Sequence, residues 1–285
     1  MPLTTLKDIL ADPQRQGWAV PAFDVINQET VLAALEGAAA ERAPVILMLL
    51  PSHTPLEHWP GLVALIEVEA ERAGVPVCLH LDHATSLGQI RPALDVGLSS
   101  VMIDGSTLPL EENIAITRQA VEAAHPLGVS VEAELGHVGY GEEVLGAEEI
   151  PSRLTRVEEA AHFVAETGVD ALAVSIGTIH GLYQGEPDLD FQRLEALRET
   201  VPVPLVLHGG SGTPDADIRR AVAGGICKIN IWTEVALVFA AALHAYLGET
   251  LGQNRLHTAM AVARAGAQEV VQQKIRLLGA AGRAA

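Results

Sequence analysis

The chain has 285 residues with 36 acidic and 18 basic side chains, which gives a formal net charge of −18 at pH 7. Such a charge repels nucleic acid and anionic membrane surfaces, so neither is expected as a partner. No apolar run approaches the ~20 residues of a membrane span, and the N-terminal segment does not resemble a signal peptide. We therefore expect a cytoplasmic protein without a transmembrane segment.

Hydrophobic residues make up 49% of the chain but aromatic residues only 4%, so small and branched aliphatic side chains dominate. This composition is typical of alternating strands and helices that pack through small side chains. The length suits two small domains or one α/β barrel, which typically needs about 250 residues. Cys78 and Cys227 are isolated in the sequence, so no disulfide framework is expected.

Short apolar runs alternate with longer segments of helical pattern along the chain. Eight runs are predicted to be strands: 18–23, 44–50, 76–81, 100–104, 129–135, 171–176, 204–208 and 227–231. Strands that alternate with helices form parallel βα units, and eight such units close into a (β/α)8 TIM barrel of the α/β class. Because no Ser- or Pro-rich linker interrupts the pattern, residues 1–285 are predicted to form a single TIM-barrel domain.

Extra helices are expected at the C-terminal end. A short helix is predicted at 217–225, where glycines end it, and two long helical patterns follow at 233–247 and 261–279. The last one exceeds what a barrel needs. Its apolar face could join another subunit or could cover the bottom of the barrel, and the sequence favours neither.

Polar residues stand where most of the predicted strands end. In a parallel barrel the carboxyl ends of all strands share one rim, and catalytic residues gather there. The residues at or soon after these ends are Asp24, Asp82, His83, Asp104, Glu134, His180, His208 and Asn230. We therefore expect them to surround one site.

Histidines follow three different strands, at His83, His180 and His208. Three protein ligands with a fourth position left open are typical of a catalytic zinc ion. A single strand-end histidine is more often structural, so the prediction depends on all three sharing the rim. The other eight histidines are interpreted as structural or surface residues, although His80 faces inwards like Asp82 and could support the site from behind.

Two polar stretches with the sequences HGGSGTP (208–214) and KINIWTE (228–234) follow the seventh and eighth predicted strands. Barrels often bind phosphate through backbone N–H groups at this place. The candidate residues are Gly209, Gly210, Ser211, Asn230 and Thr233. A turn with a positive φ explains a lone glycine equally well, but the position after these two strands favours phosphate binding.

The loop after the fifth predicted strand, ELGHVGYGEEVLG at 134–146, contains several glycines and the adjacent Glu142 and Glu143. Mobile loops often bring a carboxylate over a bound substrate, so this pair is a candidate for proton transfer. The alternative interpretation is two solvated surface glutamates.

Six motifs together resemble the class II, metal-dependent ketose-bisphosphate aldolases, in particular their short fructose- and tagatose-bisphosphate branch. They are LHLDHATS (79–86), VMIDGST (101–107), VEAELGHVG (131–139), AVSIGTIHGLY (173–183), LVLHGGSGTP (205–214) and KINIWTEV (228–235). The similarity runs from about residue 3 to the C-terminal helix. It implies a TIM-barrel lyase that makes or breaks a C–C bond between dihydroxyacetone phosphate and an aldehyde.

The resemblance implies a metal role for five residues. His83, His180 and His208 would hold the catalytic zinc ion or another divalent metal. Asp104 and Glu134 would form a secondary metal site. In this chemistry the metal stabilises the enediolate that remains when the C–C bond next to a carbonyl breaks.

It also implies roles for the residues that touch the substrate. Asp82 would act as acid or base on the hydroxyl group next to the cleaved bond, and Glu142 would move the proton of the enediolate carbon. Gly181, Gly209 and Ser211 would bind the phosphate, with their backbone near a monovalent cation. Asn230 and Thr233 would complete this pocket. The C-terminal helix would be exchanged between subunits, so a homodimer or homotetramer is expected.

This chain departs from the family where the second phosphate of a bisphosphate substrate binds. The three departing residues are Asp24 for asparagine, Leu50 for a hydroxyl residue, and Ala261 for arginine. Trp232 also replaces a smaller or acidic residue, and Arg255 or Arg264 could compensate. Asp24 would then contact the aldehyde half, and we expect that half to be unphosphorylated, although ordinary fructose- or tagatose-bisphosphate cleavage is the alternative.

Three other classes remain open. A Schiff-base aldolase would use Lys228, although this residue stands two positions before Asn230 and so deeper than the rim. A hydrolase would use a metal-activated water, but such barrels more often have two histidines on the first strand, where this chain has Asp24. A non-catalytic homologue that binds sugar phosphate or metal would not need both Asp82 and Glu142.

Overall fold

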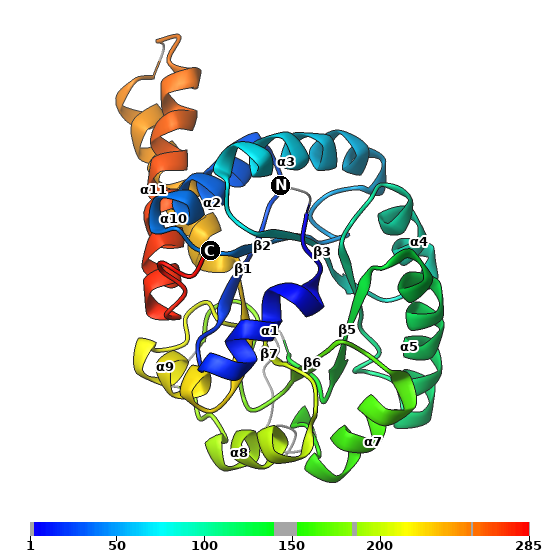
Figure 1. Cartoon of the computed structure of the whole chain (residues 1–285). Helices are drawn as coiled ribbons and strands as arrows, with labels where there is room; N and C mark the ends of the chain where they lie inside the picture. Colours follow the sequence, from blue (N-terminus) through cyan, green and yellow to red (C-terminus); the bar gives the residue numbers. More distant parts are fainter. Residues whose placement is uncertain (1–2, 140–152, 184–186, 252, 285) are drawn as a thin grey trace.

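The computed structural model describes residues 3–139, 153–183, 187–251 and 253–284. Eight parallel strands close into a barrel in chain order, which confirms the predicted fold (Figure 1). The strands are β1 (Val20–Asp24), β2 (Val45–Leu49), β3 (Val77–Ala84), β4 (Ser100–Ile103), β5 (Ser130–Leu135), β6 (Ala171–Val174), β7 (Leu205–Leu207) and β8 (Ile226–Ile231).

Helices between the strands form the outer ring of the barrel (Figure 1). They are α2 (Gln28–Glu41), α3 (Trp59–Ala73), α4 (Leu87–Asp95), α5 (Leu110–Ala124), α7 (Val157–Thr167), α8 (Phe191–Thr200) and α9 (Asp215–Ala223). Short 3-10 turns at Leu56–His58 and His125–Leu127 precede α3 and follow α5. Because helices cover the outside and side chains fill the inside, almost every strand residue is buried, as in other parallel sheets.

The first helix, α1 (Leu6–Gln16), lies across the amino-terminal end of the barrel (Figure 1). The Thr5 side chain caps it by accepting a hydrogen bond from the Asp8 N–H, and Leu6 and Leu10 are fully buried. This helix contacts β1, β3, β5 and β8. It therefore covers the bottom of the barrel and leaves the carboxyl end open.

The chain ends in a helical hairpin of α10 (Thr233–Glu249) and α11 (Leu256–Leu277) that extends beyond the barrel (Figure 1). Helix α11 packs along α2, where Gly37 allows close approach: an added Cβ there would lie 2.6 Å from Val271 Cγ1. On α10 only Val235 is buried. Neither helix covers the bottom of the barrel. No described helix is long and apolar enough to cross a membrane.

Candidate active site and metal centre

The open end of the barrel contains a cavity of about 670 Å³. Its lining combines residues from the ends of β1, β3, β6, β7 and β8, as expected for a TIM-barrel site. The sequence-predicted residues that line it are Asp24, Asp82, His83, His180, Gly181, Gly209, Ser211, Asn230 and Thr233. The rim position predicted for these residues therefore agrees with the structure.

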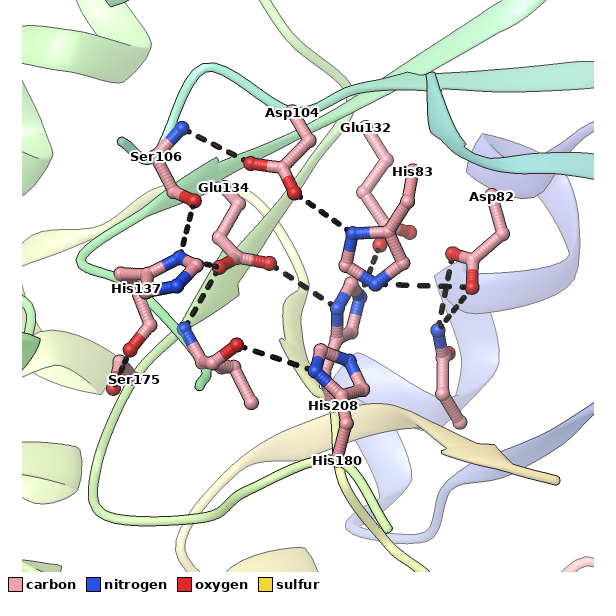
Figure 2. A network of polar contacts seen from close by, with 12 residues as sticks. Asp82, His83, Asp104, Ser106, Glu132, Glu134, His137, Ser175, His180 and His208 are labelled. Carbon is pink, nitrogen blue, oxygen red and sulfur yellow. Dashed lines mark hydrogen bonds and ion pairs between the residues drawn. The ribbon is translucent and has the colours of Figure 1, made fainter. Parts of the chain in front are cut away.

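Three imidazole rings converge beside this cavity (Figure 2). The ring centroid of His83 lies 4.9 Å from that of His180 and 4.6 Å from that of His208, and the latter two are 5.8 Å apart. One ring nitrogen from each lies within 4.8 Å of the others. This spacing suits three ligands of one cation.

Two of these rings are fixed by a hydrogen bond at Nδ1. His83 Nδ1 lies 2.8 Å from Asp104 Oδ2, and His180 Nδ1 lies 3.2 Å from the carbonyl oxygen of Val138. Because the partners are acceptors, each Nδ1 is the protonated donor and Nε2 keeps its lone pair. This is how histidine ligands of metals are usually held.

His208 is fixed in the opposite sense. Its Nε2 lies 3.0 Å from Glu132 Oε1, so Nδ1 is the nitrogen that faces the other two rings, at 3.2 Å from Glu134 Oε2. Burial alone would lower the pKa of His208, but the hydrogen bonds to Glu132 and Glu134 raise it to about 10. A bound cation would take the place of the proton that these carboxylates favour.

The chemistry of the three histidines fits a metal ligand set. His83 Nε2 is buried and has no hydrogen-bond partner in the part of the chain that the structure describes. Burying such atoms costs free energy unless a ligand satisfies them. Three imidazoles with adjacent carboxylates are the donor set of a catalytic Zn²⁺ site, so the residues present fit this ion.

A second possible ligand group shares His83. Ligand atoms of His83, Asp104 and Glu134 also lie within 4.8 Å of one another. Burial alone would raise the pKa of Asp104, but hydrogen bonds from His83 and Ser106 lower it well below the usual range. Glu134 Oε1 accepts a hydrogen bond from the Val138 N–H at 3.0 Å. Both carboxylates are thus held beside the shared histidine.

An irregularity in β3 explains how the adjacent Asp82 and His83 both reach the cavity. In a regular strand, neighbouring side chains point to opposite faces. The register with β4 shifts between Leu81 and Ala84, and His83 has a φ of +46°, in the left-handed region. Bulges of this kind redirect side chains next to active sites, and a strained histidine there is a feature of functional sites.

Asp82 is held by Asn230. The Asn230 side-chain amide donates to both carboxylate oxygens, at 3.1 and 3.2 Å. Burial alone would raise the pKa of Asp82, but His83, His208 and Lys228 outweigh it, so the pKa is lowered. Asn230 also lines the cavity, where the resemblance places it in the phosphate pocket, and its side-chain oxygen Oδ1 has no hydrogen-bond partner among the described residues.

The glycine-containing loop after β7 lies beside the start of α10. Gly209 has a φ of +71°, and a Cβ there would collide with the backbone of Ile179, so only glycine fits. Gly210 donates its N–H to the Asn230 carbonyl at 3.0 Å, so this amide is not available to a phosphate. Gly181, Gly209, Ser211 and Thr233 line the cavity here. The N-terminus of α10 adds a positive helix dipole that favours an anion.

The side of the cavity towards β1 and β2 contains Asp24, Leu50, His53 and Trp232. The rings of His53 and Trp232 pack with centroids 5.1 Å apart. Asp24 is buried, its Oδ1 has no hydrogen-bond partner, and burial together with Asp82 raises its pKa. Among the described lining residues there is no Lys or Arg, since Arg255 lies at the far end of the α10–α11 hairpin and Arg264 faces Glu36 at 3.7 Å.

Several residues in or below the site are not assigned to it from the sequence, and Lys228 is considered there only as a Schiff-base lysine. Glu132 and Lys228 are fully buried below the rim, and His53 lies in the cavity lining although it was interpreted as structural. The sequence does contain a signal that Glu132 and Lys228 face the barrel interior. Glu132 stands two residues before Glu134, and Lys228 two before Asn230, so each shares the inward face of its strand. The predicted Glu142 and its neighbour Glu143 lie outside the described residues.

A parallel eight-stranded barrel with three histidines and adjacent carboxylates at its carboxyl end is typical of a metal-dependent (β/α)8-barrel enzyme. The model of the family "Fructose-bisphosphate aldolase class-II" matches residues 4–283. The chain is 43% identical over 276 residues to the D-tagatose-1,6-bisphosphate aldolase subunit GatY of Klebsiella oxytoca, covering 97% of both chains. It therefore belongs to the class II fructose-bisphosphate aldolase family, a zinc-dependent family, and is a metal-dependent aldehyde-lyase of carbohydrate metabolism.

Solved structures agree. The crystal structure of the YdjI aldolase from Escherichia coli K12 is similar with a TM-score of 0.87 and 36% identity, covering 99% of this chain and 100% of that chain. A putative fructose-1,6-bisphosphate aldolase from Coccidioides immitis is similar with a TM-score of 0.88 and 29% identity, covering 99% of each chain. The resemblance drawn from the six motifs is confirmed.

Proposed function

We propose that this chain is a zinc-dependent aldolase that makes and breaks a C–C bond between dihydroxyacetone phosphate and an aldehyde. The observation that carries this proposal is the convergence of ring nitrogens from His83, His180 and His208, each opposite a nitrogen bonded to an acceptor. Three such donors leave a coordination position for the substrate. Bound zinc would supply Lewis acidity towards a carbonyl oxygen.

Asp82 is proposed as the acid and base at the hydroxyl group next to the reacting bond. Its lowered pKa keeps it ionised and able to accept a proton, and the two hydrogen bonds from Asn230 fix its direction. Glu142 is proposed to transfer the proton at the carbon of the dihydroxyacetone phosphate half. Asp104 and Glu134 are proposed to provide a second position for the metal, with His83 shared between the two.

The phosphate of dihydroxyacetone phosphate is proposed to bind at Gly181, Gly209 and Ser211, with Asn230 and Thr233 completing the pocket. Support comes from the backbone geometry of this loop and from the adjacent N-terminus of α10. A monovalent cation beside this backbone, as the family resemblance implies, would add positive charge where the described lining has no Lys or Arg.

Metal removal tests this function. Dialysis against EDTA is expected to abolish aldehyde release, and Zn²⁺ should restore it. Borohydride should trap no substrate on the protein, because the Lys228 ammonium is buried and bonded to both Glu132 oxygens. Full activity after verified metal removal, or borohydride trapping at Lys228, would contradict the proposal and favour the Schiff-base mechanism.

We further propose that the aldehyde half of the substrate is unphosphorylated. The raised pKa of Asp24 favours its neutral form, which offers a phosphate no positive charge, and its ionised form about 4 Å away would repel a phosphate by roughly 4 kcal/mol at an intermediate dielectric. In either protonation state the Asp24 oxygens can hydrogen-bond a hydroxyl group, while Leu50, His53 and Trp232 supply apolar and aromatic surface. A neutral polyhydroxy aldehyde suits this surface better than a phosphorylated one.

The second candidate is ordinary tagatose- or fructose-1,6-bisphosphate cleavage, which the 43% identity to the Klebsiella oxytoca subunit favours. A panel of aldehydes offered with dihydroxyacetone phosphate separates the two. We expect kcat/KM to be at least about tenfold higher for neutral hydroxyaldehydes than for glyceraldehyde 3-phosphate, because one repulsive contact of about 1.4 kcal/mol has this effect. Higher values for the bisphosphate reaction would favour the second candidate.

A homodimer or homotetramer in the cytoplasm is also proposed. The α10–α11 hairpin exposes large apolar side chains, which are Leu237, Val238, Leu247, Leu251, Leu256 and Val262. Exposed apolar surface of this kind marks interaction sites. Light scattering after size-exclusion chromatography is expected to give at least twice the 30.0 kDa chain mass. A monomer at micromolar concentration would contradict this.

A further inference from the structure

A buried group of charged side chains lies below the three histidines, inside the barrel. Glu132 on β5 and Lys228 on β8 are both fully buried, and neither lines the cavity. They cannot touch a substrate in the cavity without a rearrangement. Burying an ion pair is costly, and an apolar pair of the same volume often gives the same stability or more. A contribution to stability therefore does not explain why Glu132 and Lys228 are buried here.

The contacts of Glu132 connect this pair to the metal centre. Lys228 Nζ donates to Glu132 Oε1 at 2.9 Å and to Oε2 at 2.8 Å. Glu132 Oε1 also accepts the hydrogen bond from His208 Nε2 at 3.0 Å. The Lys228 ammonium therefore holds both carboxylate oxygens, and one of these oxygens holds the histidine ring.

The nitrogen that His208 presents depends on this contact. Its other nitrogen, Nδ1, lies 3.2 Å from Glu134 Oε2, which is a competing acceptor. Without Glu132, the ring could carry its proton on Nδ1 and donate it to Glu134. The lone pair would then lie on Nε2, directed into the barrel and away from His83 and His180.

We propose that Glu132 is a positioning residue that selects the His208 tautomer competent to bind metal, and that Lys228 keeps this carboxylate in place. The inference rests on the metal centre of the proposed function. It assigns Lys228 the role of a counter-ion within the barrel wall. The nearby His80 faces the same carboxylate: its Nε2 lies 3.8 Å from Glu132 Oε2, while its Nδ1 is paired with Ser100 Oγ at 2.8 Å.

Two double variants separate this role from a merely structural one. In Glu132→Gln/Lys228→Met both charges are removed but an acceptor oxygen for His208 remains. Glu132→Leu/Lys228→Met removes the acceptor as well and replaces the ion pair by apolar side chains, a change that proteins often tolerate. The full-length proteins would be compared by Zn²⁺ titration against a chelating dye and by the visible absorption spectrum of bound Co²⁺.

The leucine variant is expected to bind Zn²⁺ about 10–100-fold more weakly and to show an altered Co²⁺ spectrum, as when the hydrogen-bond partner of a metal ligand is removed. The glutamine variant should recover most of the affinity and the wild-type spectrum. Thr167→Val is the matched control, because it removes a buried side-chain hydrogen bond, to the Phe163 carbonyl on α7, that has no contact with Glu132, Lys228 or His208. It should leave both readouts unchanged.

Equal affinities of the two double variants, whether both wild-type or both weakened, would overturn the proposal. Glu132→Asp is a further test if the leucine variant does not fold, since the shorter side chain keeps the charge but withdraws the acceptor from His208. Wild-type Zn²⁺ affinity in this variant would equally count against the role. A wild-type chain that bound no Zn²⁺ would overturn the metal centre itself, so the two failures are distinguishable.

Discussion

Replacing Asp82 with asparagine is expected to lower kcat for C–C cleavage by about 10²–10⁴-fold, the usual contribution of a positioned acid or base. Asparagine keeps the shape of the side chain and can still accept a hydrogen bond from Asn230, but it cannot take a proton. Bound Zn²⁺ should remain at the wild-type amount, because Asp82 is not among the three proposed ligands. Steady-state cleavage kinetics and metal analysis of the same samples measure both effects.

A second readout separates the two proposed proton transfers. Exchange of the carbon-bound proton of dihydroxyacetone phosphate with solvent should persist in Asp82→Asn and be lost in Glu142→Gln. Asp170→Asn is the matched control: this carboxylate lies at the start of β6, where it accepts the Val131 N–H, and its loss should change kcat less than about threefold. Near-wild-type cleavage by Asp82→Asn would assign the hydroxyl proton to another group.

Replacing either His180 or His208, two of the three proposed zinc ligands, with alanine should abolish activity. The two variants should differ in stability. His180→Ala removes a side chain whose Nδ1 is paired with a backbone carbonyl. His208→Ala leaves the buried carboxylates of Glu132 and Glu134 without their shared partner. We expect both variants to lose stoichiometric Zn²⁺, and His208→Ala to lose about 3 kcal/mol more of the metal-free unfolding free energy.

Urea unfolding of the chelator-treated proteins and mass spectrometry of bound metal would measure these effects. Comparing metal-free forms is necessary because a metal that binds only the folded chain adds to its apparent stability. Equal unfolding free energies for the two variants would mean that Glu132 and Glu134 do not depend on His208. Retention of one Zn²⁺ per chain in either variant would remove that histidine from the ligand set.

The barrel was predictable because its strands form continuous apolar runs and its site residues stand at or after their ends. Helices on the outside of a parallel sheet make both strand faces apolar, so a polar residue at a strand end is conspicuous. The same rule placed His83, His180 and His208 together although 97 residues separate the first two. Strand ends were less accurate: β3 runs to Ala84 rather than to residue 81.

What the sequence did not reveal depends on local backbone geometry and on contacts across the barrel. The shift in β3 that brings both Asp82 and His83 to the cavity requires a left-handed φ at a histidine, which no residue pattern signals. Likewise, the contact between Glu132 and Lys228 joins β5 and β8, two strands that β6 and β7 separate in the barrel. The hydrogen bonds from the Asn230 amide to Asp82 also join two strands, β8 and β3, and no local sequence pattern indicates them.

One divalent cation bound between His83, His180 and His208 is the central claim, and anomalous diffraction tests it most directly. Data recorded on both sides of the zinc absorption edge, from crystals of active protein, should show one strong peak. It should lie about 2.0–2.1 Å from His83 Nε2, His208 Nδ1 and a ring nitrogen of His180. An equally active crystal with no peak there, or with a metal bound only elsewhere, would contradict the claim.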